Sequence, residues 1–301
     1  MENLQIETLP ELCDPIFVLA FEGWNDAARS ATLAARFLVN QYGGKRFAWF
    51  MPDDFFQYSD HRPHVRLDND GNRQISWPEN AFYYCKHPGL SRDLVVCVGV
   101  EPQLRWKTFS QDVIDLVQVC KPRLAVTMGA LLAGQSHTEP PELVCLATDP
   151  SLAKRTGVAI TKYEGPTGIV GVIHTRLQNA RIPAVSLWAN IPNYIPSLPN
   201  PKAACALLDR LGAAGEVRFD LSVLQKSADQ FDFQIKEAIK NQRGISRLLS
   251  QTDLRNVRDE KDLDNEEAAK GTEPEELLSS EGLADEIQSY LRRRNNGNSS
   301  E

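Results

Sequence analysis

Two short motifs carry the side chains best suited to chemistry. The first, residues 22–26 (EGWND), directly follows a continuous apolar run. Gly23 permits a sharp turn, and Asn25 or Asp26 can accept hydrogen bonds from the first N–H groups of a following helix. Trp24 is then left to face a cleft or a partner. The pattern therefore fits a turn with a helix cap, a ligand-facing loop or an interface anchor.

The second motif, residues 163–171 (YEGPTGIVG), leads through a Gly-Pro turn into a predicted helix. Thr167 and Gly168 head that helix, and free N–H groups at a helix start can bind an anion. The chain has no glycine-rich loop ending in Lys-Ser or Lys-Thr, and no GxGxxG motif after a strand. Two interpretations stay open: an anion site, or a tight helix entry in which Gly168 and Gly171 allow close packing.

Other residue patterns favour no specific reaction. Residues 134–138 (GQSHT) are similar to a nucleophile elbow without its second glycine, and the adjacent Ser136 and His137 are poorly placed to pair. A histidine pair at 61–64 has a proline inside it, which disfavours a helical metal site. Several carboxylates could converge as acid and base: Glu22, Asp26, Glu101, Glu139 and Glu164. We assign no catalytic residue, no metal ligand and no cofactor, and we favour a non-enzymatic protein.

Apolar runs of buried-strand length alternate with helical patterns along the chain. We expect strands at 16–21, 46–51, 93–98, 123–128, 143–147 and 184–189, and helices at 25–40, 107–120, 167–180 and 201–211. Residues 64–86 predict two or three short polar strands with a turn at 69–72 (NDGN), which together form an antiparallel excursion. A long helical pattern follows over 219–249, with Gly244 as its predicted break.

This alternation predicts a three-layer α/β/α fold with a mainly parallel sheet. Ligands of such sheets bind beyond the carboxyl ends of the strands. We therefore expect a ligand-binding site at that edge, built from the residues that follow each strand and from the second motif. Its members are Glu22, Gly23, Trp24, Asn25, Asp26, Glu101, Gly129, Glu164, Gly165, Thr167, Gly168 and Asn190.

The chain divides by pattern and charge into three parts. We expect an α/β core domain over residues 1–215, a C-terminal helical extension over 216–252, and an acidic, disordered tail over 253–301. Residues 259–286 hold 12 acidic and 2 basic side chains, which is typical of a solvated tail. Docking of this acidic segment on a basic partner is the alternative.

Composition excludes several classes of function. A formal net charge of -7 argues against general nucleic-acid binding. The longest apolar stretches, 16–21 and 94–100, are too short to cross a bilayer, and the first residues lack the basic region of a secretory signal. Six cysteines without a CxxC pair indicate reduced thiols in a cytoplasmic protein. We expect neither nucleic acid nor a membrane as a partner.

Six segments, taken together and in this order along residues 16–210, resemble the bacterial branch of the proteasome assembly chaperone 2 family. The segments at 22–27 and 163–169 are the most specific. The full set is 22–27 (EGWNDA), 60–63 (DHRP), 101–102 (EP) with Arg105, Trp106 and Phe109, 129–132 (GALL), 163–169 (YEGPTGI) and 186–188 (SLW).

The resemblance implies a fold similar to the phosphorylase/hydrolase-like architecture of nucleoside phosphorylases. It also implies a homo-oligomer, for which a trimer is expected, and a non-enzymatic assembly-chaperone role with a proteasome-related or other protein partner. It supplies no catalytic residues. Two alternatives stay open: a small-molecule protein or enzyme of phosphorylase-like architecture that takes nucleosides or phosphate, and a purely structural oligomer subunit.

Overall fold

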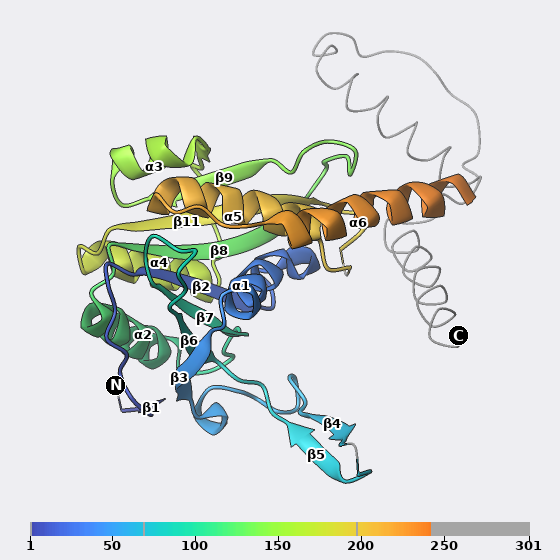
Figure 1. Cartoon of the computed structure of the whole chain (residues 1–301). Coiled ribbons are helices and arrows are strands. Elements are labelled where there is room, and N and C mark those ends of the chain that lie inside the picture. The colour runs from blue at the N-terminus through green and yellow to red at the C-terminus, as the bar shows by residue number, and fades with distance from the viewer. Residues whose placement is uncertain (1, 69, 197, 242–301) are drawn as a thin grey trace, which may run out of the picture.

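A nine-stranded sheet forms the centre of the molecule (Figure 1). The structure is a computed structural model and describes residues 2–241 except 69 and 197. Four parallel strands lie in the middle of the sheet, in the order β7 (Leu94–Val100), β2 (Ile16–Glu22), β8 (Leu124–Ala133) and β11 (Ala184–Pro192). Their carboxyl ends therefore meet at one edge of the sheet, which is where the sequence places the candidate site.

Antiparallel strands extend the parallel centre on both sides. Beyond β7 lie β6 (Ala81–Cys85), β3 (Lys45–Phe50) and β1 (Leu4–Ile6), each antiparallel to its neighbour. Beyond β11 lies β9 (Leu143–Ala147), which is antiparallel to β11, followed by β10 (Ala159–Ile160), which is parallel to β9. The expected α/β class is confirmed, with the parallel arrangement confined to the middle of the sheet and to the β9–β10 pair.

Helices cover both faces of the sheet, as the sequence predicted (Figure 1). On one face lie α1 (Ser30–Gln41), α3 (Pro150–Thr156), α5 (Pro201–Gly215) and α6 (Ser222–Asn241), and α1 is preceded by a short 3-10 helix, η1 (Ala27–Arg29). On the other face lie α2 (Trp106–Cys120) and α4 (Ile169–Asn179). The sequence analysis did not foresee α3.

The two faces of the sheet are packed differently. Strand β2 is buried on both faces: Ile16, Val18 and Ala20 face α1 and α5, while Phe17, Leu19 and Phe21 face α2 and α4. Alanines of α1 let that helix approach its side of the sheet closely. On the α2 face seven fully buried phenylalanines fill the space: Phe17, Phe21, Phe47, Phe50, Phe55, Phe82 and Phe109. Full burial of side chains of this size stabilises the fold by roughly 1.5–3 kcal/mol each.

A separate two-stranded hairpin leaves the body between β3 and β6. It consists of β4 (His64–Leu67) and β5 (Arg73–Ser76), which pair only with each other among the described strands. A second 3-10 helix, η2 (Pro52–Asp54), connects β3 to the segment that leads into the hairpin. The hairpin projects away from the sheet in Figure 1. Its two short strands agree with the excursion expected over residues 64–86, but the last part of that range forms β6 of the central sheet instead.

Two strands run further than the sequence analysis predicted. Strand β8 continues through Gly129 to Ala133, and β11 continues through Asn190 to Pro192. Gly129 and Asn190 therefore lie inside strands, and the expectation that they sit in loops beyond strand ends was wrong. The two strands pair in register up to Ala133 and Pro192, so hydrogen bonding between neighbours overrode the local signals of glycine and proline.

The C-terminal part of the chain is described only as far as Asn241. Within that range the predicted long helix is α6, which begins at Ser222 and packs on α5. The predicted break at Gly244, the acidic segment 259–286 and the marginal helix over 283–291 lie outside the described residues. The three-part division of the chain therefore stays a prediction. Among the described residues, no helix is both long and apolar enough to cross a membrane.

Candidate functional site

The bend after β2 and the start of α4 lie side by side at the carboxyl edge of the sheet. The two are joined by Glu101, which follows β7. Its backbone N–H donates to the Glu22 carbonyl oxygen over 2.8 Å, which continues the parallel ladder of β2 and β7 by one step. The two motifs singled out in the sequence, 142 positions apart from Glu22 to Glu164, thus share one rim through the topology of the sheet.

The Glu101 carboxylate holds this junction together. Its Oε1 accepts a hydrogen bond from the Asn25 side-chain Nδ2 at 2.7 Å and another from the Ile169 backbone N–H at 2.8 Å. Asn25 and Ile169 are both fully buried. A carboxylate at the first N–H groups of a helix is favourable because it meets the positive end of the helix dipole. The start of α4, which the sequence suggested as an anion site, is thus occupied by the protein's own Glu101.

Close approach at this junction explains the glycine at position 168. A Cβ atom placed on Gly168 would lie 1.9 Å from Asn25 Nδ2 and 2.5 Å from Glu101 Oε1. No side chain fits at either distance. The backbone at position 168 can therefore approach Asn25 and Glu101 this closely only if the residue is glycine. Gly23 lies on the other side of Glu101 and has a φ of +132°, a conformation that other residues rarely adopt.

Asp26 organises the neighbouring helix start. Its Oδ1 accepts from the Ala31 backbone N–H at 2.7 Å, and its Oδ2 accepts from the Thr32 hydroxyl. This confirms the expectation that Asn25 or Asp26 caps the following helix. Burial disfavours the charged carboxylate and raises the pKa of Asp26 from 3.8 to about 6, although its hydrogen bonds with Thr32 and Ala31 lower it.

The chain between Asp26 and α1 is bent in an unusual way. Ala28 and Arg29 have φ values of +52° and +48°. Left-handed conformations of residues other than glycine cost about 1–3 kcal/mol each. The surrounding contacts hold this bend in place: the Ala28 N–H donates to the Pro196 carbonyl, and the Ala28 carbonyl accepts from the Asn200 N–H.

The other predicted site residues do not join this junction through their side chains. The Glu22 carboxylate turns to Arg36, with 2.9 Å between Oε1 and Nη2. Glu164 is exposed, and Gly165 lies against the ring of Tyr163. The Thr167 hydroxyl lies against Gly171, where a Cβ atom would stand only 2.0 Å from it. The carboxylates of Glu22, Glu101 and Glu164 therefore face three different surroundings rather than one acid–base pair.

Gly129 and Asn190 serve the sheet instead. A Cβ on Gly129 would lie 2.5 Å from the indole of Trp188, so glycine lets the Trp188 ring lie flat across β8. Asn190 donates its backbone N–H to the Glu142 carbonyl and extends the pairing of β11 with the chain leading into β9. Both residues stay on the predicted edge of the sheet, but their contacts are structural.

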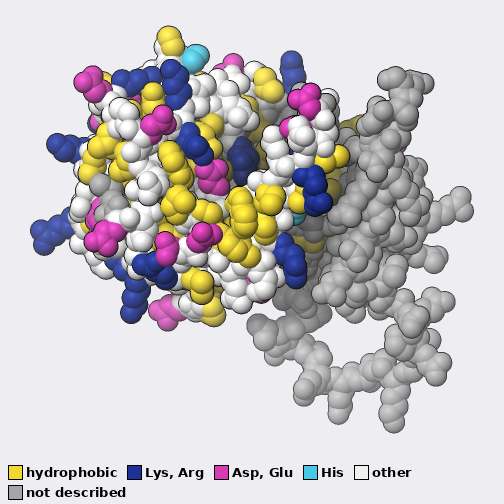
Figure 2. All heavy atoms as spheres, turned by 90° about the horizontal axis from the view of Figure 1, so that it is seen from below, with side chains coloured by type: hydrophobic (Ala, Val, Ile, Leu, Met, Phe, Trp, Pro, Cys, Tyr) yellow, Lys and Arg dark blue, Asp and Glu magenta, His cyan; other side chains and the backbone are white. Residues whose placement is uncertain are grey.

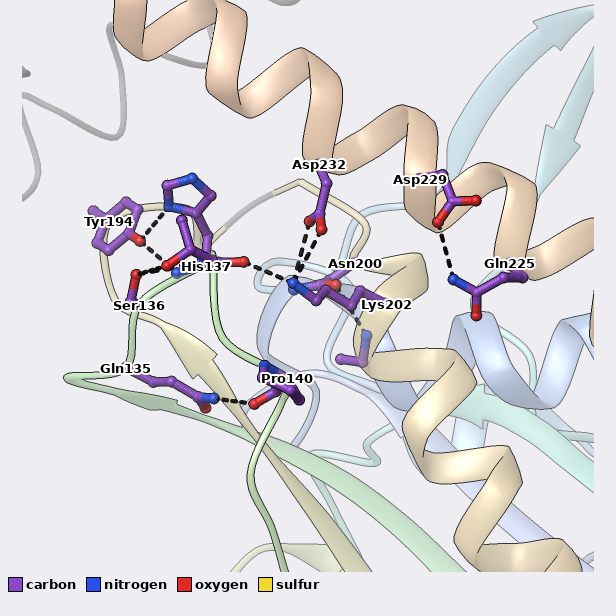
Figure 3. A network of polar contacts seen from close by, with 12 residues as sticks. Gln135, Ser136, His137, Pro140, Tyr194, Asn200, Lys202, Gln225, Asp229 and Asp232 are labelled. Atoms are coloured by element: carbon purple, nitrogen blue, oxygen red, sulfur yellow. Dashed lines mark hydrogen bonds and ion pairs between the residues drawn. The ribbon is translucent and has the colours of Figure 1, made fainter.

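The GQSHT segment shows no nucleophile arrangement. The Ser136 hydroxyl lies 2.8 Å from the Thr138 hydroxyl, and the His137 ring Nδ1 lies 2.7 Å from the Tyr194 hydroxyl (Figure 3). Ser136 and His137 thus turn to different partners. In the part of the chain that the structure describes, no three His, Cys, Asp or Glu side chains come together in a way that could hold a metal ion.

A polar network that the sequence did not reveal ties α6 to the body (Figure 3). Lys202, at the start of α5, donates to the His137 carbonyl oxygen at 2.8 Å and pairs with the Asp232 carboxylate of α6 at 3.0 Å. The segment between β8 and β9 therefore meets α5 and α6 at a single ammonium group. No local pattern links Lys202 with Asp232, because they lie on different helices.

Exposed apolar side chains lie at the same edge of the sheet as the Glu101 junction. We call four of them the apolar rim: Trp24, Leu104, Leu131 and Leu132, whose exposed fractions run from 38% to 61%. They follow or end the adjacent strands β2, β7 and β8. Trp24 was expected to face a cleft or a partner, and it is exposed. Leu104, Leu131 and Leu132 were missed, because exposure of an apolar residue leaves no local signal.

Comparisons with known proteins place the chain among related structures. The PAC2 family model matches residues 20–239. A PAC2 family protein from Streptomyces avermitilis is 35% identical with a TM-score of 0.70, over 78% of this chain and 99% of that one. A proteasome-assembly chaperone homologue of Mycobacterium tuberculosis, Rv2125, is 34% identical with the same TM-score and the same coverage.

A more distant structure shares the fold. PbaB of Pyrococcus furiosus, an archaeal proteasome activator, is 19% identical with a TM-score of 0.61, over 78% of this chain and 97% of that one. No curated protein sequence matches the chain.

Proposed function

The chain belongs to the PAC2 family, and from this premise we propose that it is a non-enzymatic, assembly-chaperone-like protein that acts by binding other proteins. Its partner in this proposal is a proteasome-related protein. The support is the similarity, at 34% identity, to a bacterial protein described as a proteasome-assembly chaperone homologue. The more distant likeness to the proteasome activator PbaB supplies the fold alone.

The apolar rim is the observation that carries the binding role. Trp24, Leu104, Leu131 and Leu132 are exposed at or after the ends of three adjacent strands, at the sheet edge where Glu101 bonds Asn25 and Ile169. Large exposed apolar side chains that gather in one place mark surfaces for protein contacts. Tryptophan is also among the residues that contribute most to protein–protein binding.

In this proposal the residues predicted to bind a ligand have structural and protein-binding roles instead. Those of the junction, Gly23, Asn25, Asp26, Glu101 and Gly168, hold the rim in shape, and Trp24 contacts the partner. Binding of a nucleoside or phosphate at the start of α4 is the weaker alternative, because the Glu101 carboxylate takes the N–H group that an anion would need.

The proposal includes a cytoplasmic homo-oligomer, with a trimer as the expected assembly. Free thiols support the location: all six cysteines are unpaired, and five of them are buried. A closed assembly is the usual arrangement for a homo-oligomer.

Binding to proteasome subunits tests the proposal. We would incubate the purified full chain with purified proteasome α-subunits of the same organism and follow complex formation and proteasome assembly by size exclusion with light scattering. Trp24→Asp and Leu131→Asp place charges on the apolar rim and should abolish the complex.

Val119→Asp is the matched control, since Val119 on α2 is 44% exposed, like the 43% exposed Leu104 of the rim, but lies away from it. Val119→Asp should leave complex formation unchanged. The proposal is wrong if the unaltered chain neither binds the subunits nor changes the yield of assembled proteasome.

A further inference from the structure

The hairpin of β4 and β5 has one apolar face that nothing in the described chain covers. We call these two strands, His64–Leu67 and Arg73–Ser76, the arm. Val65, Leu67 and Ile75 point to the same side of its two strands, since Val65 pairs with Ile75 and Leu67 with Arg73. Their exposed fractions are 48%, 68% and 55%. Figure 2 views the molecule from below, the side to which the arm projects, and shows hydrophobic side chains exposed among charged ones on this side of the molecule.

The residue pattern of the arm is that of a half-buried sheet. Apolar and polar residues alternate along β4 as His64, Val65, Arg66, Leu67, so that one face is apolar and the other is polar. Such alternation is typical of strands with one face packed on a core. An isolated two-stranded hairpin is only marginally stable in water. The arm thus has the pattern of a packed element but projects into solvent.

A hollow at the base of the arm offers matching chemistry. It has a volume of about 620 Å³, which is the size of a ligand-binding concavity, and its lining includes Trp49, Met51, Asp53, Trp77 and Glu79. Met51 and Trp77 are among the exposed large apolar residues. Ser76, the last residue of the arm, also lines the hollow, so the two lie next to each other.

The charges of the two surfaces are opposite. Arg73 stands on the apolar face of the arm, and it has no carboxylate partner within the described part of the chain. In the hollow, Asp53 accepts a hydrogen bond from the uncharged Tyr58 hydroxyl at 2.5 Å, so its negative charge is not neutralised there. Glu79 already pairs with Arg46. The arm therefore brings a cation to a hollow that holds an uncompensated carboxylate.

We propose that the apolar face of the arm packs into the base hollow of a second copy of this chain, with Arg73 beside the second copy's Asp53. This inference rests on the proposed homo-oligomer and names the surface that forms it. A second copy is the occupant because the apolar face of the arm and the hollow that would receive it lie side by side on the same chain. This is the requirement for self-complementary contacts between identical subunits.

The dimensions of the arm support contact with the body rather than with another arm. Its four-residue strands are about 14 Å long at ~3.4 Å per residue and lie about 4.8 Å apart. Two arms laid face to face would cover a few hundred Å² on each, well below the ~800 Å² per partner of a standard stable interface. Insertion into the hollow adds the surface around Trp49, Met51 and Trp77.

The test measures self-association of the full 301-residue chain by sedimentation and by size exclusion with light scattering. The unaltered chain should have a mass that is a multiple of 33.7 kDa. Leu67→Asp, Arg73→Asp and Asp53→Arg should each weaken self-association at least about tenfold, which corresponds to ~1.4 kcal/mol. The double variant R73D/D53R should restore it, because the charges are exchanged between the same two positions.

Val119→Asp on α2 is the control and should leave self-association unchanged. Thermal unfolding of each variant should match that of the unaltered chain measured at a concentration where it is monomeric, since the arm strands are exposed. The inference alone is wrong if the chain is oligomeric but the arm variants leave its mass unchanged. A chain that stays monomeric at all concentrations would overturn both this inference and the proposed homo-oligomer, while binding to proteasome subunits could persist.

A third outcome assigns the arm to another protein. If the arm variants keep the oligomer intact but no longer bind proteasome subunits, the occupant of the hollow is not a second copy, and the inference is overturned. Restoration of the oligomer by the double charge exchange is the result that only a contact between Arg73 and Asp53 of two copies predicts.

Discussion

Replacing Glu101 with alanine should loosen the junction between the bend after β2 and α4. The change removes Glu101 Oε1, the oxygen that accepts from both Asn25 Nδ2 and the Ile169 N–H, at 2.7 Å and 2.8 Å. Both donors belong to fully buried residues. A buried donor left without an acceptor costs about 1–3 kcal/mol, and loss of the negative charge at the helix start costs about 0.3–1 kcal/mol.

We expect the free energy of unfolding to fall by about 3 kcal/mol, because water entering the space left by the side chain recovers part of the loss. For a domain of this size the midpoint of thermal unfolding should drop by roughly 6–12 °C. Differential scanning calorimetry and urea unfolding of the full chain measure the two quantities independently.

Two matched variants separate the causes. Glu101→Gln keeps an oxygen acceptor and loses only the charge, so it should cost about 1 kcal/mol or less. Glu164→Ala removes an exposed carboxylate from the same motif region and should change stability by less than ~0.5 kcal/mol. Equal effects of Glu101→Ala and Glu164→Ala would refute the assignment of Glu101 as the group that holds the junction.

Three further changes probe the junction, the cap of the helix after β2 and the contact between α5 and α6. Gly168→Ala places a Cβ 1.9 Å from Asn25 Nδ2 and should destabilise the fold by at least ~2 kcal/mol in urea unfolding, so a neutral result contradicts the close packing. Burial raises the pKa of Asp26 in the native state to about 6, compared with 3.8 for the ordinary carboxyl group. The native state therefore binds this proton more tightly than the unfolded state does. The resulting contribution to stability is fully present below pH 3.8 and is lost as the pH rises through about 6. Relative to Asp26→Asn, the unaltered chain should lose up to about 3 kcal/mol between pH 3.8 and pH 7, and a pH-independent difference argues against the raised pKa. Lys202→Met breaks the contact with Asp232 and should speed amide hydrogen exchange in α6 while leaving exchange in α4 unchanged. If α6 exchanges at the same rate in the variant and in the unaltered protein, the ion pair does not hold α6 in place.

Fold class followed from the sequence because it depends on patterns that are local. Runs such as Ile16–Phe21 are apolar at every position, which is typical of a strand buried on both faces. The helix cap at Asp26 was likewise legible, since the residue types that accept from the first N–H groups are few. The helix α3 escaped because its seven residues are too few to show a periodic apolar face.

Strand ends were less predictable, and this affected the candidate site. Gly129 and Asn190 carry residue types that favour loops, but the register of β8 with β11 extends the strands past them. The strength of pairing between neighbouring strands depends on partners that are distant in sequence. It therefore overrides local preference in a way that no short window can reveal.

The sequence by itself determined most of the strands and helices, that the carboxyl edge of the sheet gathers both motifs, and that Asn25 or Asp26 caps a helix. Only the tertiary structure decided that Glu101, rather than a ligand, meets the start of α4, that Lys202 reaches Asp232, and that the arm stands free of the body. The physical reason is that propensity and periodicity act between near neighbours, whereas hydrogen bonds and exposure are set by residues that the fold brings together from distant positions.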